Sequence, residues 1–278
     1  MKTLYGLTKQ FMLICLCLFI SCVIVIAQSE DEGFEPQSGQ SGKDVVWVPT
    51  TNELVDVMLD LAELTSDDFL VDLGSGDGRT VIAAAKRGAR ARGVEFNPKM
   101  VELSRKRAEE AGVSDRATFI EGDLFEADIS DATVITLFLL TSINLKLRPT
   151  LLELKPGTRI VTNTFTMEAW EADSTASVDD PYSTWGTALL WIVPAKVTGT
   201  WRLSQGTLTL DQEFQMLSGT LNNGNATIPI EDGRMRGTQI SFNAGGADYM
   251  GTVNGSRIEG TVISNGSNRT WTATLSSN

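Results

Sequence analysis

The sequence contains no histidine among its 278 residues. This absence excludes Ser-His-Asp triads, histidine general bases and metal sites built on imidazole. Cysteine is scarce as well, and Cys15, Cys17 and Cys22 all lie in one apolar run near the start of the chain. The rest of the chain therefore has neither a disulfide nor a thiol nucleophile. Its chemistry must come from carboxylates, hydroxyls, amides, Lys, Arg or a bound cofactor, and we expect no metal site.

Basic residues are also few, because 23 Lys and Arg stand against 35 Asp and Glu, for a formal net charge of −12. Proteins bind nucleic acids and anionic membranes through basic side chains, so we expect neither as a nonspecific partner. An acidic surface suits a lysine-bearing protein or peptide, although acidity is also a common way to keep a protein soluble.

The first 27 residues have the pattern of a targeting segment. Lys2 and Lys9 precede an apolar run over residues 11–27, which ends at a small-residue cleavage motif. A run of 17 residues is also at the lower end of what spans a bilayer, so an uncleaved anchor is the alternative. With lysines before the run and acids after it, the rest of the chain is expected outside the cytoplasm. We predict export to the periplasm or medium, or anchoring through residues 11–27.

Composition divides the remaining chain into three parts. Residues 28–44 are rich in Gln, Ser, Gly, Glu and Asp, which predicts a flexible linker. Residues 45–195 alternate strand and helix patterns, which predicts a Rossmann-like, doubly wound α/β domain with a mostly parallel sheet. Residues 196–278 form seven short alternating runs punctuated by Asn-Gly pairs, which predicts a C-terminal all-β antiparallel domain, a small barrel or sandwich.

Local signals set several element boundaries. Thr50 followed by Glu53 predicts a helix start with a capping box. Asn97 and Pro98 predict the start of a second helix. We predict a short helix over residues 145–154 that is broken at Pro149.

The stretch from Phe69 to Arg79 organises the α/β domain. An apolar run ends in an acid and three glycines at alternate positions, and a helical pattern follows. A strand, a Gly-rich turn and a helix start form a cradle for a nucleotide. The dinucleotide fingerprint is G-x-G-x-x-G, whereas the spacing here is G-x-G-x-G. This difference weakens a nicotinamide site, and an ordinary Gly-rich turn is the other alternative.

Acidic residues also follow the next two predicted strands. Glu95 stands about 20 residues after the glycine turn, where an acid that binds ribose is expected. Asp123 ends the third strand and could meet an adenine amino group, with Leu124 against the ring. Each acid alone is more often a satisfied loop carboxylate, but three successive strand ends together indicate a nucleoside site. The candidate cofactor-binding residues are Asp72, Gly74, Ser75, Gly76, Asp77, Gly78, Glu95, Asp123 and Leu124.

The Asp72–Arg79 motif resembles motif I of the class I S-adenosylmethionine-dependent methyltransferases. Further segments are similar to a group of small protein-lysine methyltransferases known from mitochondria, and the resemblance covers about residues 45–200. Those segments are Val48-Pro49-Thr50, Val94-Glu95, Gly122-Asp123-Leu124-Phe125, Thr136-Leu137-Phe138-Leu139-Leu140 and Leu152–Gly157. The resemblance implies S-adenosyl-L-methionine as cofactor and methyl transfer to an amine nucleophile, such as a protein lysine.

The chain departs from that group at two positions, where Phe138 replaces an expected Tyr and Thr141 an expected Pro. It also lacks the N/D-P-P-Y tetrapeptide of many amide- and base-directed N-methyltransferases. Candidate catalytic residues near the fourth strand end are Thr141, Ser142 and Asn144, and helix capping is an equal alternative for them.

The predicted export conflicts with a cofactor that is a cytoplasmic metabolite. The alternative function is therefore an exported, non-catalytic binding protein on a methyltransferase fold, with the C-terminal β domain as its interaction module.

Overall fold

The computed structural model describes residues 34–179 and 184–276. The predicted targeting segment and the first residues of the predicted linker lie outside these ranges. Within them, none of the helices combines the length and apolar character needed to cross a membrane.

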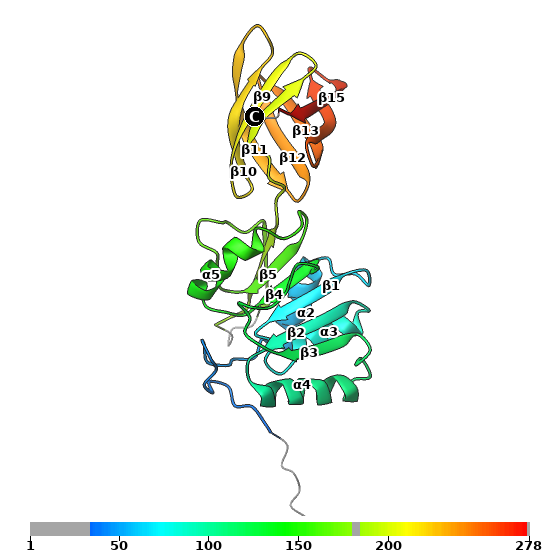
Figure 1. Ribbon diagram of the computed structural model, residues 1–278, viewed down its shortest axis with the longest axis vertical. Helices are drawn as coiled ribbons and strands as arrows, with labels where there is room; N and C mark the ends of the chain where they lie inside the picture. Colours follow the sequence, from blue (N-terminus) through cyan, green and yellow to red (C-terminus); the bar gives the residue numbers. More distant parts are fainter. Residues whose placement is uncertain (1–33, 180–183, 277–278) are drawn as a thin grey trace, which may run out of the picture. The chain divides into compact units, whose positions relative to one another are not determined.

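The α/β part is built on a seven-stranded sheet with the order β3-β2-β1-β4-β5-β7-β6 (Figure 1). The first five strands are parallel, and β7 runs antiparallel to both β5 and β6. Because the chain proceeds from β1 to β2 on one side and returns to β4 on the other, β1 and β4 flank a switch point, where such sheets bind ligands. The strands are β1 Phe69–Leu73, β2 Arg90–Glu95, β3 Ala117–Glu121, β4 Val134–Leu137, β5 Arg159–Asn163, β6 Ser174–Ser177 and β7 Thr187–Ile192.

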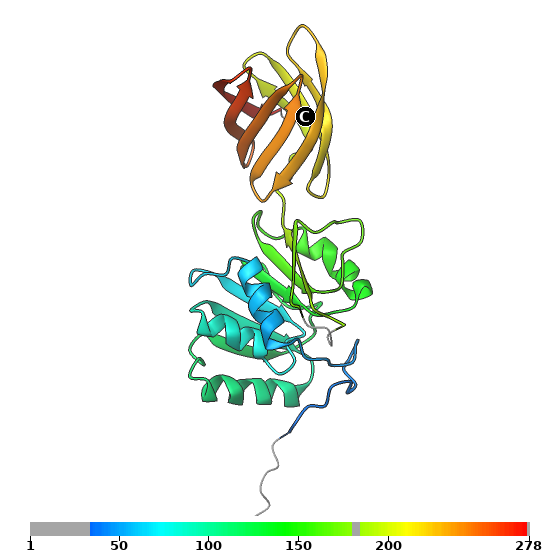
Figure 2. The same ribbon diagram turned by 180° about the vertical axis from the view of Figure 1, so that it is seen from behind.

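Helices cover both faces of this sheet, as the predicted fold class requires. One apolar cluster joins α2, α3 and α4 to one face, and a second joins α5 to the other. Figure 2 shows α2 and α3 in front of the sheet, in the view from behind Figure 1. The helices are α2 Asn52–Leu61, α3 Arg79–Lys86, α4 Pro98–Glu110 and α5 Thr141–Leu151.

Three helix starts test the boundary predictions. The start of α4 is confirmed, because Asn97 is its N-cap and Pro98 lies in its first turn. The predicted cap of α2 is wrong: Thr51 accepts the N-terminal hydrogen bond, while the buried Thr50 hydroxyl accepts one from Asn163 on β5. Helix α5 begins four residues earlier than predicted and continues through Pro149.

The C-terminal part is a closed antiparallel barrel of eight strands in which β15 pairs with β8. The sequence pattern shows only seven runs because the run over 234–242 spans the end of β11, a turn in which Gly237 has a φ of 59°, and the start of β12. Trp201, Phe242 and Trp271 are among the apolar side chains that fill the interior, so it is a packed core. The strands are β8 Gly199–Leu203, β9 Gly206–Glu213, β10 Met216–Asn222, β11 Thr227–Arg236, β12 Gln239–Ala244, β13 Ala247–Asn254, β14 Arg257–Ser264 and β15 Ser267–Leu275.

Candidate functional site

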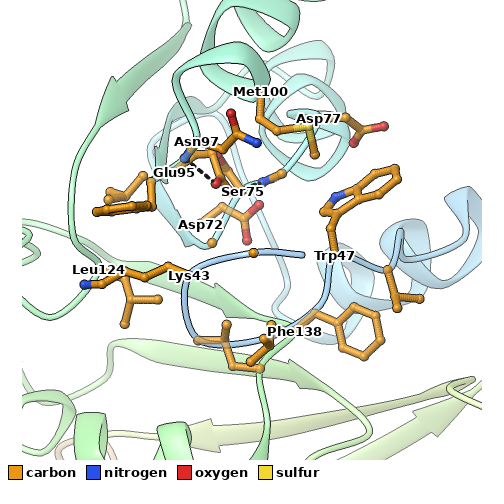
Figure 3. Close-up of a pocket in the computed structure, with 18 of the residues that line it drawn as sticks. Lys43, Trp47, Asp72, Ser75, Asp77, Glu95, Asn97, Met100, Leu124 and Phe138 are labelled. Atoms are coloured by element: carbon orange, nitrogen blue, oxygen red, sulfur yellow. Dashed lines mark hydrogen bonds between the residues drawn. The ribbon is translucent and has the colours of Figure 1, made fainter. Parts of the chain in front are cut away.

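A pocket opens at the carboxyl ends of the parallel strands (Figure 3). It is lined by every predicted cofactor-binding residue except Gly78. The three predicted acids, Asp72, Glu95 and Asp123, thus reach one site although they come from three different strand ends.

Asp72 is one of two buried acids that line the pocket, with 7% of its surface exposed. Thr136 on the neighbouring strand β4 donates a hydrogen bond of 2.6 Å from its hydroxyl to the Asp72 carboxylate. Among the described residues Asp72 has no ion pair. Burial raises its pKa to about 7, the Thr136 hydrogen bond opposes the shift, and the charges of Glu95 and Asp77 add to it. A buried acid without a cation beside it suits a ligand that brings its own, such as the ammonium group of a methionine tail.

Glu95 is held at the end of β2 by two main-chain groups. The Gly76 N–H donates to one carboxylate oxygen at 2.9 Å, and the Asn97 N–H donates to the other at 2.8 Å. These bonds fix the carboxylate between the glycine turn and the start of α4. An ionised carboxylate can accept about four hydrogen bonds, so capacity remains for the two hydroxyls of a ribose.

Asp123 lies two residues after β3, and both of its oxygens are engaged. The Phe125 N–H donates to one at 3.0 Å, and the Lys43 ammonium forms an ion pair with the other. The Lys43 hydrogen bond, followed by that of Phe125, holds the pKa of Asp123 below its ordinary value. The Lys43 nitrogen also lies 4.9 Å from the centre of the Phe96 ring. The acid expected to meet an adenine is therefore paired with a lysine of the chain itself.

Lys43 belongs to a segment that we call the strap, residues 40–50, which lines the pocket. Figure 3 shows Lys43 and Trp47 on this loop. A Cβ at Gly76 would lie 2.4 Å from the Trp47 ring nitrogen, so the indole needs the glycine in order to pack there. Residues 40–44 belong to the stretch whose polar composition predicts a flexible linker, whereas in the structure they line the pocket. Trp47, a large apolar residue three positions after that stretch, is the signal in the sequence that this segment packs against the pocket.

Two predicted cofactor residues have structural roles. Arg79 donates hydrogen bonds to both oxygens of the Asp77 carboxylate, and Arg107 donates to one of them. Burial alone would raise the pKa of Asp77, but these arginines outweigh it and hold the pKa below its ordinary value. Gly78 has a φ of 80°, and a Cβ there would lie 2.8 Å from the Phe119 ring and from Ser104. The third glycine thus allows close packing beneath the turn.

The three catalytic candidates are divided by their exposure. Asn144 is fully buried and cannot touch a substrate; its amide donates to the carbonyls of Phe165 and Thr166 at 3.1 and 3.4 Å. Thr141 and Ser142 begin α5 and are accessible. Neither caps the helix, because the N-cap is Leu140 and no side chain caps it.

Comparisons with known proteins find methyltransferase relatives of this chain. The model of the ANTKMT methyltransferase domain matches residues 72–174. A protein-lysine N-methyltransferase of Saccharolobus islandicus is 44% identical over 139 residues, which are 49% of this chain and 86% of that protein. The adenine nucleotide translocase lysine N-methyltransferase of Mus musculus is 39% identical over 104 residues, 37% of this chain and 45% of its own length.

One similar solved structure contains S-adenosyl-L-homocysteine, the product that S-adenosyl-L-methionine leaves after methyl transfer. An RNA methyltransferase from Salinibacter ruber, in complex with S-adenosyl-L-homocysteine, is 49% identical, with a TM-score of 0.51, over 54% of this chain and 96% of its own. The comparisons support S-adenosyl-L-methionine as the cofactor, and the pocket lined by Asp72, Glu95 and Asp123 is the candidate site for it.

Proposed function

The chain belongs to the class I S-adenosylmethionine-dependent methyltransferases of the protein-lysine group, and we propose that it methylates the side-chain amine of a protein lysine. The observation that carries the proposal is the 44% identity to an archaeal protein-lysine N-methyltransferase across 86% of that protein. The chain spans less than half the length of the mouse relative. We therefore do not propose the acceptor protein of that relative as the acceptor of this chain.

When bound, the cofactor supplies a sulfonium methyl group that an amine lone pair can take, so that the S–C bond breaks, its electron pair stays on sulfur and a proton leaves the new ammonium. The part of the protein is to bind the cofactor and to orient it. Glu95 would hold the ribose hydroxyls, Asp123 the adenine amino group and Asp72 the ammonium of the methionine tail. Fixing two reactants in line supplies most of the rate enhancement for such a transfer.

RNA is a second candidate acceptor, because the relative from Salinibacter ruber is described as an RNA methyltransferase. The net charge of −12 opposes it, since an RNA site needs basic side chains to neutralise phosphates.

Cofactor binding is the first test. Calorimetry of the full chain with S-adenosyl-L-methionine should show binding, and Glu95→Ala should weaken it by about 1–3 kcal/mol, because hydrogen-bonding groups are left unpaired. Wild-type protein that does not bind millimolar cofactor would overturn the enzymatic function.

The acceptor is the second test. A cell extract is incubated with the chain and methyl-labelled cofactor, and portions are then treated with protease or ribonuclease. We expect protease-sensitive label that acid hydrolysis releases as methyl-lysine. Label removed by ribonuclease would replace lysine with RNA as the acceptor.

We also propose that the α/β domain acts outside the cytoplasm, on the basic and apolar pattern of residues 1–27. Cell fractionation with N-terminal sequencing tests this. A chain that starts near Gln28 outside the cytoplasm indicates cleavage, and a full-length membrane-bound chain indicates an anchor. Intact chain in the cytoplasm would contradict both.

A further inference from the structure

Three partly exposed aromatic side chains meet beside the pocket. Phe138 directly follows β4 and lines the pocket, Phe165 follows β5, and Trp185 precedes β7. The Phe138 ring centre lies 6.0 Å from that of Phe165 and 6.1 Å from that of Trp185, edge to face in the second pair. The start of β7 lies beside the end of β5, since Asn163 pairs with Ala188, so all three come from one edge of the sheet.

The strand order places this cluster on the acceptor side. The acids that fit the cofactor step across the sheet from β3 (Asp123) through β2 (Glu95) to β1 (Asp72). In the covalent structure of the cofactor, the sulfonium lies between the ribose and the amino-acid tail, so its methyl group belongs near β1. The next strands in the sheet are β4, β5 and β7. A nucleophile that approaches from this side meets Phe138 first.

We infer that Phe138, Phe165 and Trp185 form the wall of the passage by which an alkylamine reaches the methyl group, and that their π faces select the cationic side chain of lysine. This inference rests on the proposed function and names the residues that determine its acceptor. In Figure 3 Phe138 borders the pocket across from Asp72.

Aromatic walls suit both states of the amine. A carboxylate beside the amine would keep it protonated, and a protonated amine has no lone pair to attack with. An apolar wall instead removes water, which favours the neutral amine. After transfer the nitrogen is cationic again, and aromatic faces attract alkylammonium groups, including methylated ones.

Two side chains hold the main chain of Phe165 in this wall. Its carbonyl accepts hydrogen bonds from the Thr162 hydroxyl at 2.7 Å and from the Asn144 amide at 3.1 Å. The preceding residue, Thr164, has a φ of 61°, which is unfavourable for a β-branched residue. Strain of this kind persists where the surroundings over-determine the backbone, and it concentrates at functional sites.

The test measures binding without turnover. The full chain is saturated with S-adenosyl-L-homocysteine and titrated with butyltrimethylammonium chloride, a mimic of the trimethylated lysine side chain, by ligand-observed NMR. Phe138→Leu, Phe165→Leu and Trp185→Leu should each weaken binding by about 2- to 30-fold, the range of one cation–π contact. Phe138→Tyr keeps the ring and should keep the affinity. Phe125→Leu is the matched control, because Phe125 is 39% exposed against 38% for Trp185 and does not line the pocket.

Calorimetry with S-adenosyl-L-homocysteine verifies that each variant is folded and is saturated with this compound during the cation titration. The passage is overturned if the wild type does not bind the cation, or if the three leucine variants bind it as tightly as the wild type does. The acceptor experiment fails separately: label on RNA would overturn lysine methylation whatever the cation titration gives, and label on lysine with unchanged cation binding would overturn the passage alone.

Discussion

The side-chain amide of Asn144 donates hydrogen bonds to the main-chain carbonyls of Phe165 and Thr166, at 3.1 and 3.4 Å. One helical turn later on α5, Arg148 donates to the carbonyl of Met167 at 2.9 Å. One face of α5 therefore holds the loop after β5, and that loop carries Phe165. If the inferred passage is correct, Asn144 is a positioning residue that acts on it through the backbone of Phe165.

Asn144→Leu should disturb the acceptor side and spare the cofactor. The change leaves buried carbonyls with fewer donors, which should cost about 1–3 kcal/mol of unfolding free energy. We expect affinity for butyltrimethylammonium to fall severalfold while affinity for S-adenosyl-L-homocysteine stays the same. Thr150→Ala, at an exposed position of α5, is the control. A purely structural role for Asn144 would lower stability and leave the cation affinity unchanged.

Asp72 makes the stability of the protein depend on pH. Its folded pKa is raised to about 7 from an ordinary value of 3.8, so between these limits the folded state binds more protons than the unfolded state. Stability is therefore greatest below the unfolded pKa and falls as pH rises, by roughly 1.4 kcal/mol per pH unit from about 4 to 7. Asp72→Asn should remove this fall, whereas Asp67→Asn, at an exposed position, should not. Urea unfolding across pH 4–8 measures both, and parallel curves for wild type and Asp72→Asn would refute the assignment.

Much of the cofactor site was predictable because it depends on local sequence. An acid at a strand end and glycines in the following turn have fixed neighbours along the chain, so the sequence alone indicates Asp72, Gly76 and Glu95, which line one pocket in the structure. The parallel strand order then brought the acids together, as the alternation of strands and helices indicated.

The missed features all depend on contacts between distant parts of the chain. Thr50 loses its capping role because Asn163, far along the chain, donates to its hydroxyl. The strap looked like a linker because its contacts are with residues such as Gly76 and Asp123. Asn144 looked like a catalytic amide because composition cannot tell a buried side chain from an accessible one.

Replacement of Gly78 should cost more stability than replacement of a glycine whose Cβ position is open. At a φ of 80° any Cβ is strained, and here it would also lie 2.8 Å from Phe119 and Ser104. Gly112 is a matched control, with a φ of 69° and nothing within 4 Å of the Cβ position. Gly112→Ala should therefore lose about 1 kcal/mol from backbone strain alone. Gly78→Ala should lose about 1–3 kcal/mol more from overpacking, and equal losses in thermal unfolding would contradict the packing role.

With the cofactor placed as proposed, its adenine amino group and Lys43 compete for Asp123. Both oxygens of Asp123 are engaged, so a ligand that binds this carboxylate must displace or share the Lys43 ammonium. Lys43→Met keeps the alkyl stem and removes the charge. We expect it to raise cofactor affinity by roughly 2- to 5-fold, the modest range of a partly exposed ion pair.

The dependence of cofactor affinity on salt tells whether Lys43 competes with the cofactor or helps to hold it. Ions screen an exposed pair, so wild-type affinity for the cofactor should rise between about 50 and 500 mM NaCl, and that of Lys43→Met should change little. Lys155→Met, which removes the exposed partner of Asp131, should behave as wild type in calorimetry. Weaker binding by Lys43→Met would instead mean that the lysine secures the strap over the bound cofactor, because the loss of a competitor can only strengthen binding.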